Sequence, residues 1–198
     1  MIRFIKNILD IKNLLGMQRT IPPVPDPAYP ANQFVLRSQI SGLITFIPIY
    51  NGTLHMQYTQ GGVVIETDSP SGNSGTTFAI FNDIGEDLVI TGNLEQITIN
   101  GGVDFVAVNN TVDTIFDVGL DTAVLDMRNA DNLVGLLPAI TNIRTLYAIA
   151  NNSTQRTLCK QIIDNGIDGG VLWIDRTQAY AMQVIASATA HSWTVNDL

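Results

Sequence analysis

The feature that most constrains this chain is a series of short runs of β-branched and aromatic residues, each bounded by turn residues, which begins at Phe34. Six such runs precede residue 93: FVLRS, LITFIPI, TLHMQYT, VVIET, TFAIF and DLVIT. Runs of this length joined by short polar turns are typical of strands in an antiparallel sandwich. The sequence therefore predicts a β-sandwich over residues 34–92.

Three turn signals set the expected connections within this sandwich. Asn51-Gly52 predicts a hairpin, because both central positions of a type I′ turn need positive φ. Gly61-Gly62 and the stretch from Ser69 to Gly75 predict two further turns. Pro48 lacks an N–H group, so we expect it at a strand edge or a bulge.

Residues 93–198 repeat an L-x-x-L-x-L pattern of apolar positions. Its members are Leu94, Ile97, Ile99, Val103, Val106, Val108, Thr122, Leu125, Met127, Ile143, Leu146 and Ala148, with Asn151 after the last copy. The middle positions 106, 125 and 146 stand 19 and 21 residues apart. This spacing is close to the period of leucine-rich repeats, in which successive coils bury one shared apolar column.

Two helices are expected after these repeats. Residues 153–166 predict a helix with Ser153 as N-cap, and the strand VLWID follows it. A second helix begins near Thr177 and leads into a last strand at residues 193–195. The expected fold class is mainly β with some α: an N-terminal helix, an antiparallel β-sandwich, and a leucine-rich-repeat-like β-solenoid over 93–198 with two capping helices.

The run TLCKQIIDNGIDGGVLWID followed by VIASATAHSWTV resembles the closing unit of leucine-rich-repeat-like proteins of tailed bacteriophages. In that family a helix, a strand and a second helix end in a G-W-T-V-like strand, and Ser192 stands here where the pattern has glycine. A small sandwich resembling a PKD domain often precedes the repeats. Its W-G-D-G motif corresponds to Gln57–Gly62, which lacks the tryptophan and the aspartate.

Residues 1–16 predict an amphipathic anchor helix, because apolar side chains recur at helical spacing. The expected assembly residues are Phe4, Ile8, Ile11 and Leu15 on the apolar stripe, with Arg3 and Lys6 beside it. An isolated helix of this length is marginal in water, so the stripe needs a partner. That partner is a second copy, another protein, the chain's own body or a membrane surface. The linker, residues 17–33, holds five of the eight prolines and favours extended polyproline geometry, which keeps the helix away from the body.

Charge divides the chain into a basic head and an acidic body. Residues 1–20 carry four basic residues and one acidic residue, a net charge of +3, whereas residues 21–198 carry six and 17, a net charge of −11. Such a body is unlike a basic nucleic-acid binder. One cysteine and two histidines exclude a disulfide framework and disfavour a zinc site. No apolar run in the sequence is long enough to span a membrane.

Candidate catalytic and metal-binding residues are sparse. Cys159 and His191 could form a nucleophile and base, but a cysteine after Leu158 in a helix is typical of a buried thiol. Asp83, Glu86 and Asp87 could bind calcium, although a solvated turn is the preferred interpretation. Paired carboxylates for glycoside cleavage stay open among the 18 acidic residues. We expect no catalytic residues, no cofactor and no metal.

The resemblance implies a structural virion component on the virion surface, of the head-fibre or capsid-decoration kind. Such a protein would be a dimer or trimer, or dock on a capsid or other virion protein, through its N-terminal helix. The alternative is a receptor- or glycan-binding module of a phage tail or cell surface. Its stacking surfaces would be the aromatic side chains Tyr147, Trp173, Tyr180 and Trp193. Exposure of these rings separates the two hypotheses.

Overall fold

The computed structural model describes residues 28–72, 75–117, 122–136 and 142–198. The predicted anchor helix and residues 17–27 of the linker lie outside this part. The elements in chain order are β1 (Phe34–Arg37), β2 (Leu43–Gln60), β3 (Val63–Asp68), β4 (Phe78–Phe81), β5 (Asp87–Gly101), β6 (Phe105–Ala107), β7 (Thr114–Asp117), β8 (Val124–Asp126), β9 (Gly135–Leu136), β10 (Thr145–Ala148), α2 (Ser153–Asn165), β11 (Val171–Ile174), α3 (Ala181–Ala190) and β12 (Thr194–Asp197). The chain is therefore mainly β with some α, as predicted.

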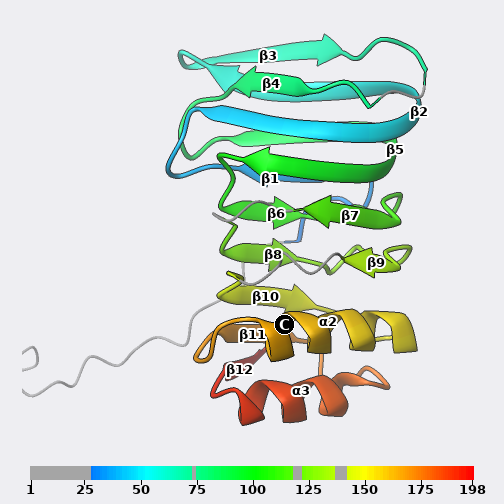
Figure 1. The fold of residues 1–198 in the computed structure, drawn as a ribbon, viewed down its shortest axis with the longest axis vertical. Coiled ribbons are helices and arrows are strands. Elements are labelled where there is room, and N and C mark those ends of the chain that lie inside the picture. Colours follow the sequence, from blue (N-terminus) through cyan, green and yellow to red (C-terminus); the bar gives the residue numbers. More distant parts are fainter. Residues whose placement is uncertain (1–27, 73–74, 118–121, 137–141) are drawn as a thin grey trace, which may run out of the picture.

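The strands form two rows that share the long strands β2 and β5, and they cross the long axis of the molecule (Figure 1). The long row runs from β3 through the second half of β2, the first half of β5, β1, β6, β8, β10 and β11 to β12. The short row contains β4, the first half of β2, the second half of β5, β7 and β9. Strands from β1 to β5 pair antiparallel with one another, and the strands that follow β6 pair in parallel.

The hairpin predicted at Asn51-Gly52 is wrong, because the chain turns a corner there without reversing. On either side of the corner β2 keeps the same partner: Asn51 lies opposite Asn93, and His55 lies opposite Thr91. Gly52 has a φ of 86°, whereas Asn51 does not have a positive φ, so only one of the two positions has the conformation of a type I′ turn. The long-range pairing with β5 places this positive φ at a bend between the two rows.

The turn predicted at Gly61-Gly62 is confirmed. Gln60 and Val63 pair across it, and the two glycines have φ values of 61° and 74°, as a type I′ turn requires. Pro48 pairs with Ile97 of β5, whereas β4 pairs only with residues 43–46 of β2. The missing N–H of Pro48 therefore removes no hydrogen bond between β2 and β4. At Pro48 the β4 side of β2 is an edge, which agrees with the expected position.

The parallel strands align the apolar positions that the repeat pattern singled out. Val106 lies opposite Leu125, and Leu125 lies opposite Leu146. Leu172 and Val195 extend the same column into β11 and β12. The side chains from Val106 to Leu172 in this column are fully buried, so the spacing of 19 and 21 residues reflects one parallel strand per copy of the pattern.

Both predicted helices are present, with shifted starts. The N-cap of α2 is Asn152, one residue before Ser153, because the Asn152 side chain accepts a hydrogen bond from the N–H of Gln155 at 2.9 Å. Asp175 binds Thr177 and Gln178 through its carboxylate, which lowers the pKa of Asp175. These bonds hold a turn ahead of α3, which therefore begins at residue 181.

One hydrophobic cluster extends through the described part of the chain, from Phe34 to Trp193. It contains buried side chains of the long row, of the short row and of both helices. The boundary predicted between residues 92 and 93 falls inside β5. Helix α3 packs on α2 and on β11 and β12, at the end of the long row.

Ser192 has a φ of 60°, which makes it a non-glycine residue in the left-handed region. This is the position where the phage pattern has glycine. A side chain in this conformation costs about 1 kcal/mol relative to glycine. We expect Ser192→Gly to raise the free energy of unfolding by about 0.5–1 kcal/mol in urea denaturation. An equal or lower stability would contradict this prediction.

Asp83 holds the β2–β3 turn through its carboxylate. The N–H groups of Gly61 and Gly62 donate to it at 2.9 and 2.7 Å. These bonds, that from Gly62 above all, lower the pKa of Asp83. A carboxylate with a lowered pKa stabilises the folded chain above its usual pKa of about 3.9, and this contribution is lost as the pH falls through the lower folded value.

We therefore expect Asp83→Ala to destabilise the chain at pH 7 and to lose that effect at strongly acidic pH. The free energy of unfolding of both chains, measured in urea across this range, checks the prediction. Glu86→Ala is the matched control, because this exposed carboxylate lies in the same loop while the N–H groups of the turn donate to Asp83. A difference for Asp83→Ala that persisted at low pH would show that the carboxylate charge is not responsible.

Candidate functional site

The candidate site is the face of the parallel strands that points away from the core, here called the outer face. Along β6, β8, β10, β11 and β12 its central column comprises Ala107, Asp126, Tyr147, Trp173 and Asn196. These residues alternate with the core positions and do not belong to the main hydrophobic cluster. The alternation places polar and aromatic groups side by side on neighbouring strands.

Two of the four predicted recognition aromatics meet on the outer face. The rings of Tyr147 and Trp173 stack at a centroid distance of 6.1 Å with an interplanar angle of 6°. The guanidinium of Arg128 lies over the Tyr147 ring at 4.7 Å. Both rings are nevertheless buried, with only 6% and 5% of their surface exposed. The stack therefore contributes packing and cation–π attraction and presents little free ring surface.

A buried ion pair adjoins this stack. The Arg128 guanidinium donates to both carboxylate oxygens of Asp126, with nitrogen–oxygen distances between 2.5 and 3.1 Å. The backbone N–H of Arg128 also donates to Asp126. The two side chains are 9% and 4% exposed. Bidentate contact with a planar guanidinium is the geometry that compensates best for burying both charges.

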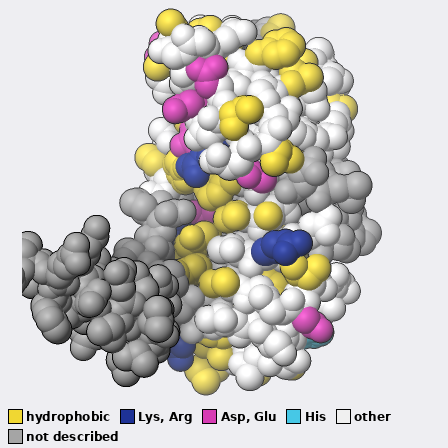
Figure 2. Space-filling view, turned by 90° about the vertical axis from the view of Figure 1, so that its left-hand side faces the viewer, with side chains coloured by type: hydrophobic (Ala, Val, Ile, Leu, Met, Phe, Trp, Pro, Cys, Tyr) yellow, Lys and Arg dark blue, Asp and Glu magenta, His cyan; other side chains and the backbone are white. Residues whose placement is uncertain are grey.

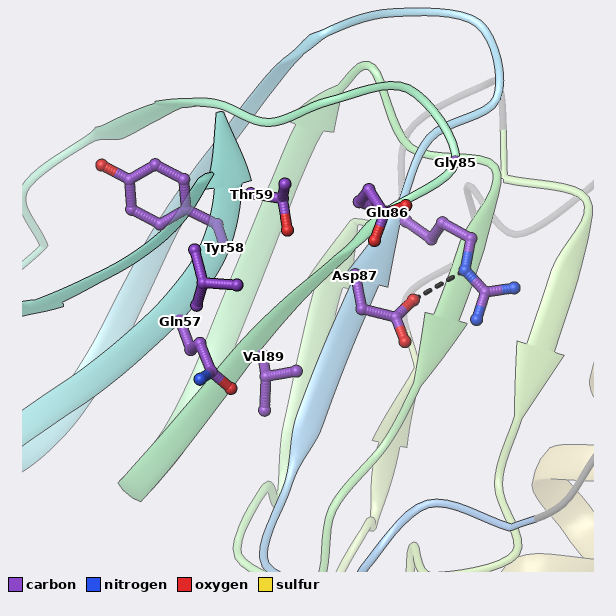
Figure 3. Close-up of a pocket in the computed structure, with 9 residues that line it drawn as sticks. Gln57, Tyr58, Thr59, Gly85, Glu86, Asp87 and Val89 are labelled. Atoms are coloured by element: carbon purple, nitrogen blue, oxygen red, sulfur yellow. Dashed lines mark hydrogen bonds and ion pairs between the residues drawn. The ribbon is translucent and has the colours of Figure 1, made fainter. Parts of the chain in front are cut away.

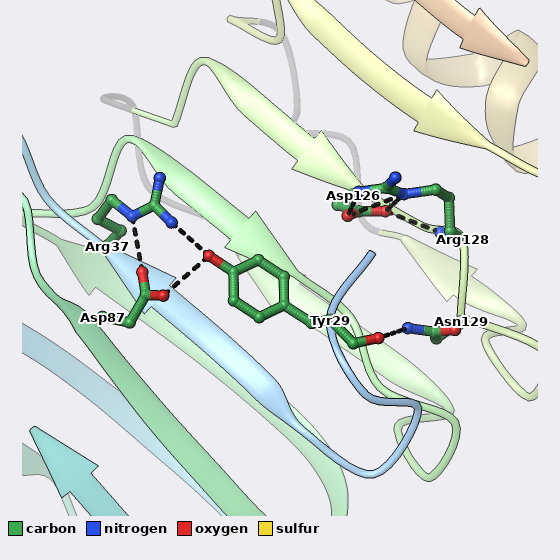
Figure 4. Close-up of polar contacts among 6 residues, drawn as sticks. All are labelled: Tyr29, Arg37, Asp87, Asp126, Arg128 and Asn129. Carbon is green, nitrogen blue, oxygen red and sulfur yellow. Dashed lines mark hydrogen bonds and ion pairs between the residues drawn. The ribbon is translucent and has the colours of Figure 1, made fainter. Parts of the chain in front are cut away.

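Tyr29, at the end of the proline-rich linker, is fixed on the outer face (Figure 4). Its hydroxyl donates to Asp87 at 2.9 Å and accepts from Arg37, and its ring packs against Phe105. The Asn129 side chain donates to the Tyr29 carbonyl at 2.7 Å. The composition of the linker predicts that it extends to residue 33. These contacts instead attach the chain to the body from Tyr29 onward.

Arg37 joins this attachment to the sheet. Its Nε donates to Asp87 at 2.6 Å, and its guanidinium lies 4.7 Å from the centre of the Phe105 ring. An open depression of about 240 Å³ lies beside this ion pair, between β3 and the loop before β5 (Figure 3). Its lining includes Gln57, Thr59 and the carboxyl groups of Glu86 and Asp87. The depression is polar and shallow, and Asp87 is already engaged by Arg37 and Tyr29.

The other two predicted aromatics lie elsewhere. Trp193 belongs to the main core cluster, and its indole N–H donates to the carbonyl of Ile167 at 2.9 Å. Tyr180 precedes α3, is half-buried, and lies under the guanidinium of Arg156. The structure thus brings Tyr147 and Trp173 together and separates both from Tyr180 and Trp193.

The candidate nucleophile and its base are not paired in a way that activates the thiol. Cys159 is buried, and desolvation raises its pKa to about 12. His191 instead contacts Asp168 at 3.0 Å and Asp164 at 3.6 Å. The other histidine, His55, pairs with Asp68 across β2 and β3.

The acidic residues considered for calcium are divided between two structural roles. Asp83 caps the β2–β3 turn, and Asp87 binds Arg37 and Tyr29. Within the described ranges, no group of three or more histidine, cysteine, aspartate or glutamate residues could hold a metal ion. The same ranges contain no helix both long and apolar enough to cross a membrane.

Sequence reasoning named Asp87 only as a possible calcium ligand and missed the other polar residues of this site. Arg37, Asp126 and Arg128 are three of the 28 charged side chains, and no local motif marks them. Alternation along Val124–Arg128 was the available signal, since Asp126 and Arg128 flank the core residue Met127. The predicted assembly residues Phe4, Ile8, Ile11, Leu15, Arg3 and Lys6 lie outside the described residues.

Comparison with protein-family models, with curated proteins and with solved structures finds no match to this chain.

Proposed function

We propose that this protein is a structural component of a tailed-bacteriophage virion, a head fibre or capsid decoration protein displayed on the virion surface. In this proposal residues 1–16 form an anchor helix that assembles a dimer or trimer or docks on a capsid or other virion protein. The body then consists of an antiparallel β-sandwich over residues 34–92 and a leucine-rich-repeat-like solenoid over 93–198, with α2 and α3 as the closing helices of the solenoid. The resemblance of residues 157–175 and 184–195 to phage proteins motivates the proposal.

The observation that carries the proposal is the attachment at Tyr29. Four side chains hold this residue: that of Arg37, eight residues away, and those of Asp87, Phe105 and Asn129 from distant parts of the chain. A linker that served only as a loose tail would not need such a fixed exit point. The polar contacts and the ring contact give the preceding segment a defined origin on a rigid acidic body, as anchoring requires.

The burial of the aromatic residues favours this proposal over a receptor- or glycan-binding module. Stacking on a sugar ring needs an accessible aromatic face. Tyr147, Trp173 and Trp193 are at most 6% exposed, and Tyr180 is half-buried beneath Arg156. None of the four therefore offers an open aromatic platform.

Two measurements test the proposal. In a culture that produces the virus, the protein should band with purified particles in a density gradient, in multiple copies per particle. Recovery only in the soluble fraction would contradict a virion role.

For the anchor, Ile8→Asp in the full chain should abolish particle binding, because it places a charge on the apolar stripe. Asn13→Asp, off the stripe, is the matched control and should bind normally.

A further inference from the structure

Exposed hydrophobic side chains concentrate at one end of the molecule. Six of the nine large hydrophobic residues that are exposed in the described part lie between residues 40 and 84: Ile40, Leu43, Val63, Val64, Phe81 and Ile84. In Figure 2 hydrophobic side chains are visible over the upper end, which is the β3–β4 end in Figure 1. Val63 and Val64, 62% and 60% exposed, lie on β3, the edge strand of the long row.

The pairing with β2 determines which backbone groups of β3 point to the free edge. The two-residue turn makes Gln60 and Val63 a hydrogen-bonded pair, so every second residue of β3 from Val63 onward bonds to β2. The bond between the Ser69 N–H and the Leu54 carbonyl at 2.8 Å follows the same alternation. The N–H and C=O groups of Val64, Glu66 and Asp68 therefore point away from β2. No described strand pairs with this side of β3.

This edge lacks lysine, proline and a bulge, and its charged side chains are Glu66 and Asp68. Natural edge strands are commonly blocked by lysine, proline or a bulge. The sequence of β3, VVIETD, contains neither residue, and its pairing with β2 is regular over six residue pairs. The two exposed valines add apolar surface that a neighbouring strand would cover.

From this edge we infer that β3 pairs antiparallel with β3 of a second copy across a two-fold axis, so that the long rows of two molecules form one sheet. The register must place the outward-pointing N–H and C=O groups of the two strands opposite one another, and it must keep carboxylates from facing each other. With Glu66 on the axis, two carboxylates would face each other, and with Thr67 on the axis Glu66 would face Asp68. With Ile65 on the axis, each Val64 faces the partner's Glu66, and both exchange main-chain hydrogen bonds.

This register also fits the ends of the strand. Val63 then faces the partner's Thr67, and pairing stops at Gly62, whose N–H is already bound by Asp83. The contact is self-complementary and closes after two copies, as a two-fold interface must. It uses the body alone, so it is independent of the anchor segment and of the proposed virion role.

Cysteine crosslinking of the full chain tests the register. In a non-hydrogen-bonded antiparallel pair the Cα atoms lie about 4.5 Å apart, within the range of a disulfide. Ile65→Cys should therefore crosslink to itself under mild oxidation by copper phenanthroline. Val63→Cys and Thr67→Cys should each stay uncrosslinked alone and crosslink when mixed. The native Cys159 is buried and gives no background.

Charge variants of the full chain test the interface energetics by analytical ultracentrifugation. Val64→Glu places a carboxylate opposite the partner's Glu66 twice and should weaken self-association roughly tenfold. Val64→Lys should preserve or strengthen it. Val134→Glu is the matched control, because Val134 is 65% exposed and lies outside β3.

Three outcomes would overturn the inference. Self-crosslinking by Thr67→Cys or Val63→Cys would show a different register. A head-to-tail contact between β3 and β12 would leave the two Ile65→Cys sites apart and uncrosslinked. Equal self-association of Val64→Glu and the unchanged chain would show that another surface joins the copies.

Discussion

Gly102→Ala is expected to destabilise the chain by roughly 3 kcal/mol, the sum of left-handed strain and a steric clash. Gly102 has a φ of 74°, and a Cβ atom there would lie 2.1 Å from the carbonyl oxygen of Leu43. That oxygen is backbone at the start of β2, so a side-chain rotation cannot relieve the clash. In a chain of this length the melting temperature should fall by roughly 6–12 °C.

Gly61→Ala is the matched control for this prediction. Gly61 has a similar φ of 61°, but a Cβ atom added there would have no neighbouring atom within 4 Å. The substitution should cost only about 1 kcal/mol, the strain of the left-handed conformation. Urea denaturation of both variants separates strain from clash. Equal losses would show that β2 moves away from residue 102 without cost.

Asp126→Ala is expected to destabilise the chain by about 3–5 kcal/mol, the usual cost of removing one partner of a buried ion pair. The substitution takes the carboxylate away from beside a guanidinium that is only 9% exposed. It also removes the acceptor for the backbone N–H of Arg128. The cation–π contact with Tyr147 depends on the same guanidinium position, so the fluorescence of the neighbouring Trp173 should change as well.

An exposed ion pair provides the comparison. Arg176 and Asp197 approach to 2.5 Å, but their side chains are 47% and 66% exposed. Asp197→Ala should therefore cost less than about 1 kcal/mol. Measured free energies of unfolding for the two variants check the prediction. Similar losses would mean that burial does not govern the strength of the Asp126–Arg128 pair.

Elements governed by local residues can be predicted from the sequence. Helix α2 is predictable because its apolar spacing and its end at Gly166 are local features. The column Val106–Leu125–Leu146 is predictable because the same apolar position recurs at a nearly constant spacing in the sequence. At Asn51-Gly52 the local signal correctly indicates positive φ at Gly52 but not at Asn51, and it cannot indicate a bend. Pairing with β5, about 40 residues away, decides between a bend and a reversal.

The outer face depends on contacts that no local pattern encodes. Tyr29 is bound by Asn129, 100 residues later in the chain, and by Asp87, 58 residues later. In the sequence Tyr29 is only an aromatic residue among prolines, so composition alone predicts a linker that runs past it. The aromatic residues stand out in the sequence by their type, but their burial depends on how the strands stack.

The position of the Tyr29 attachment has a consequence for how the molecule would be displayed. Its partners lie on β1, β5 and β6 and just after β8, near the middle of the long row. A molecule tethered through the residues before Tyr29 would thus be held near the middle of its long axis and not at one end. Both ends, at β3 and at β12, would then remain accessible. Two neighbours on one surface could then meet end to end while each keeps its own tether.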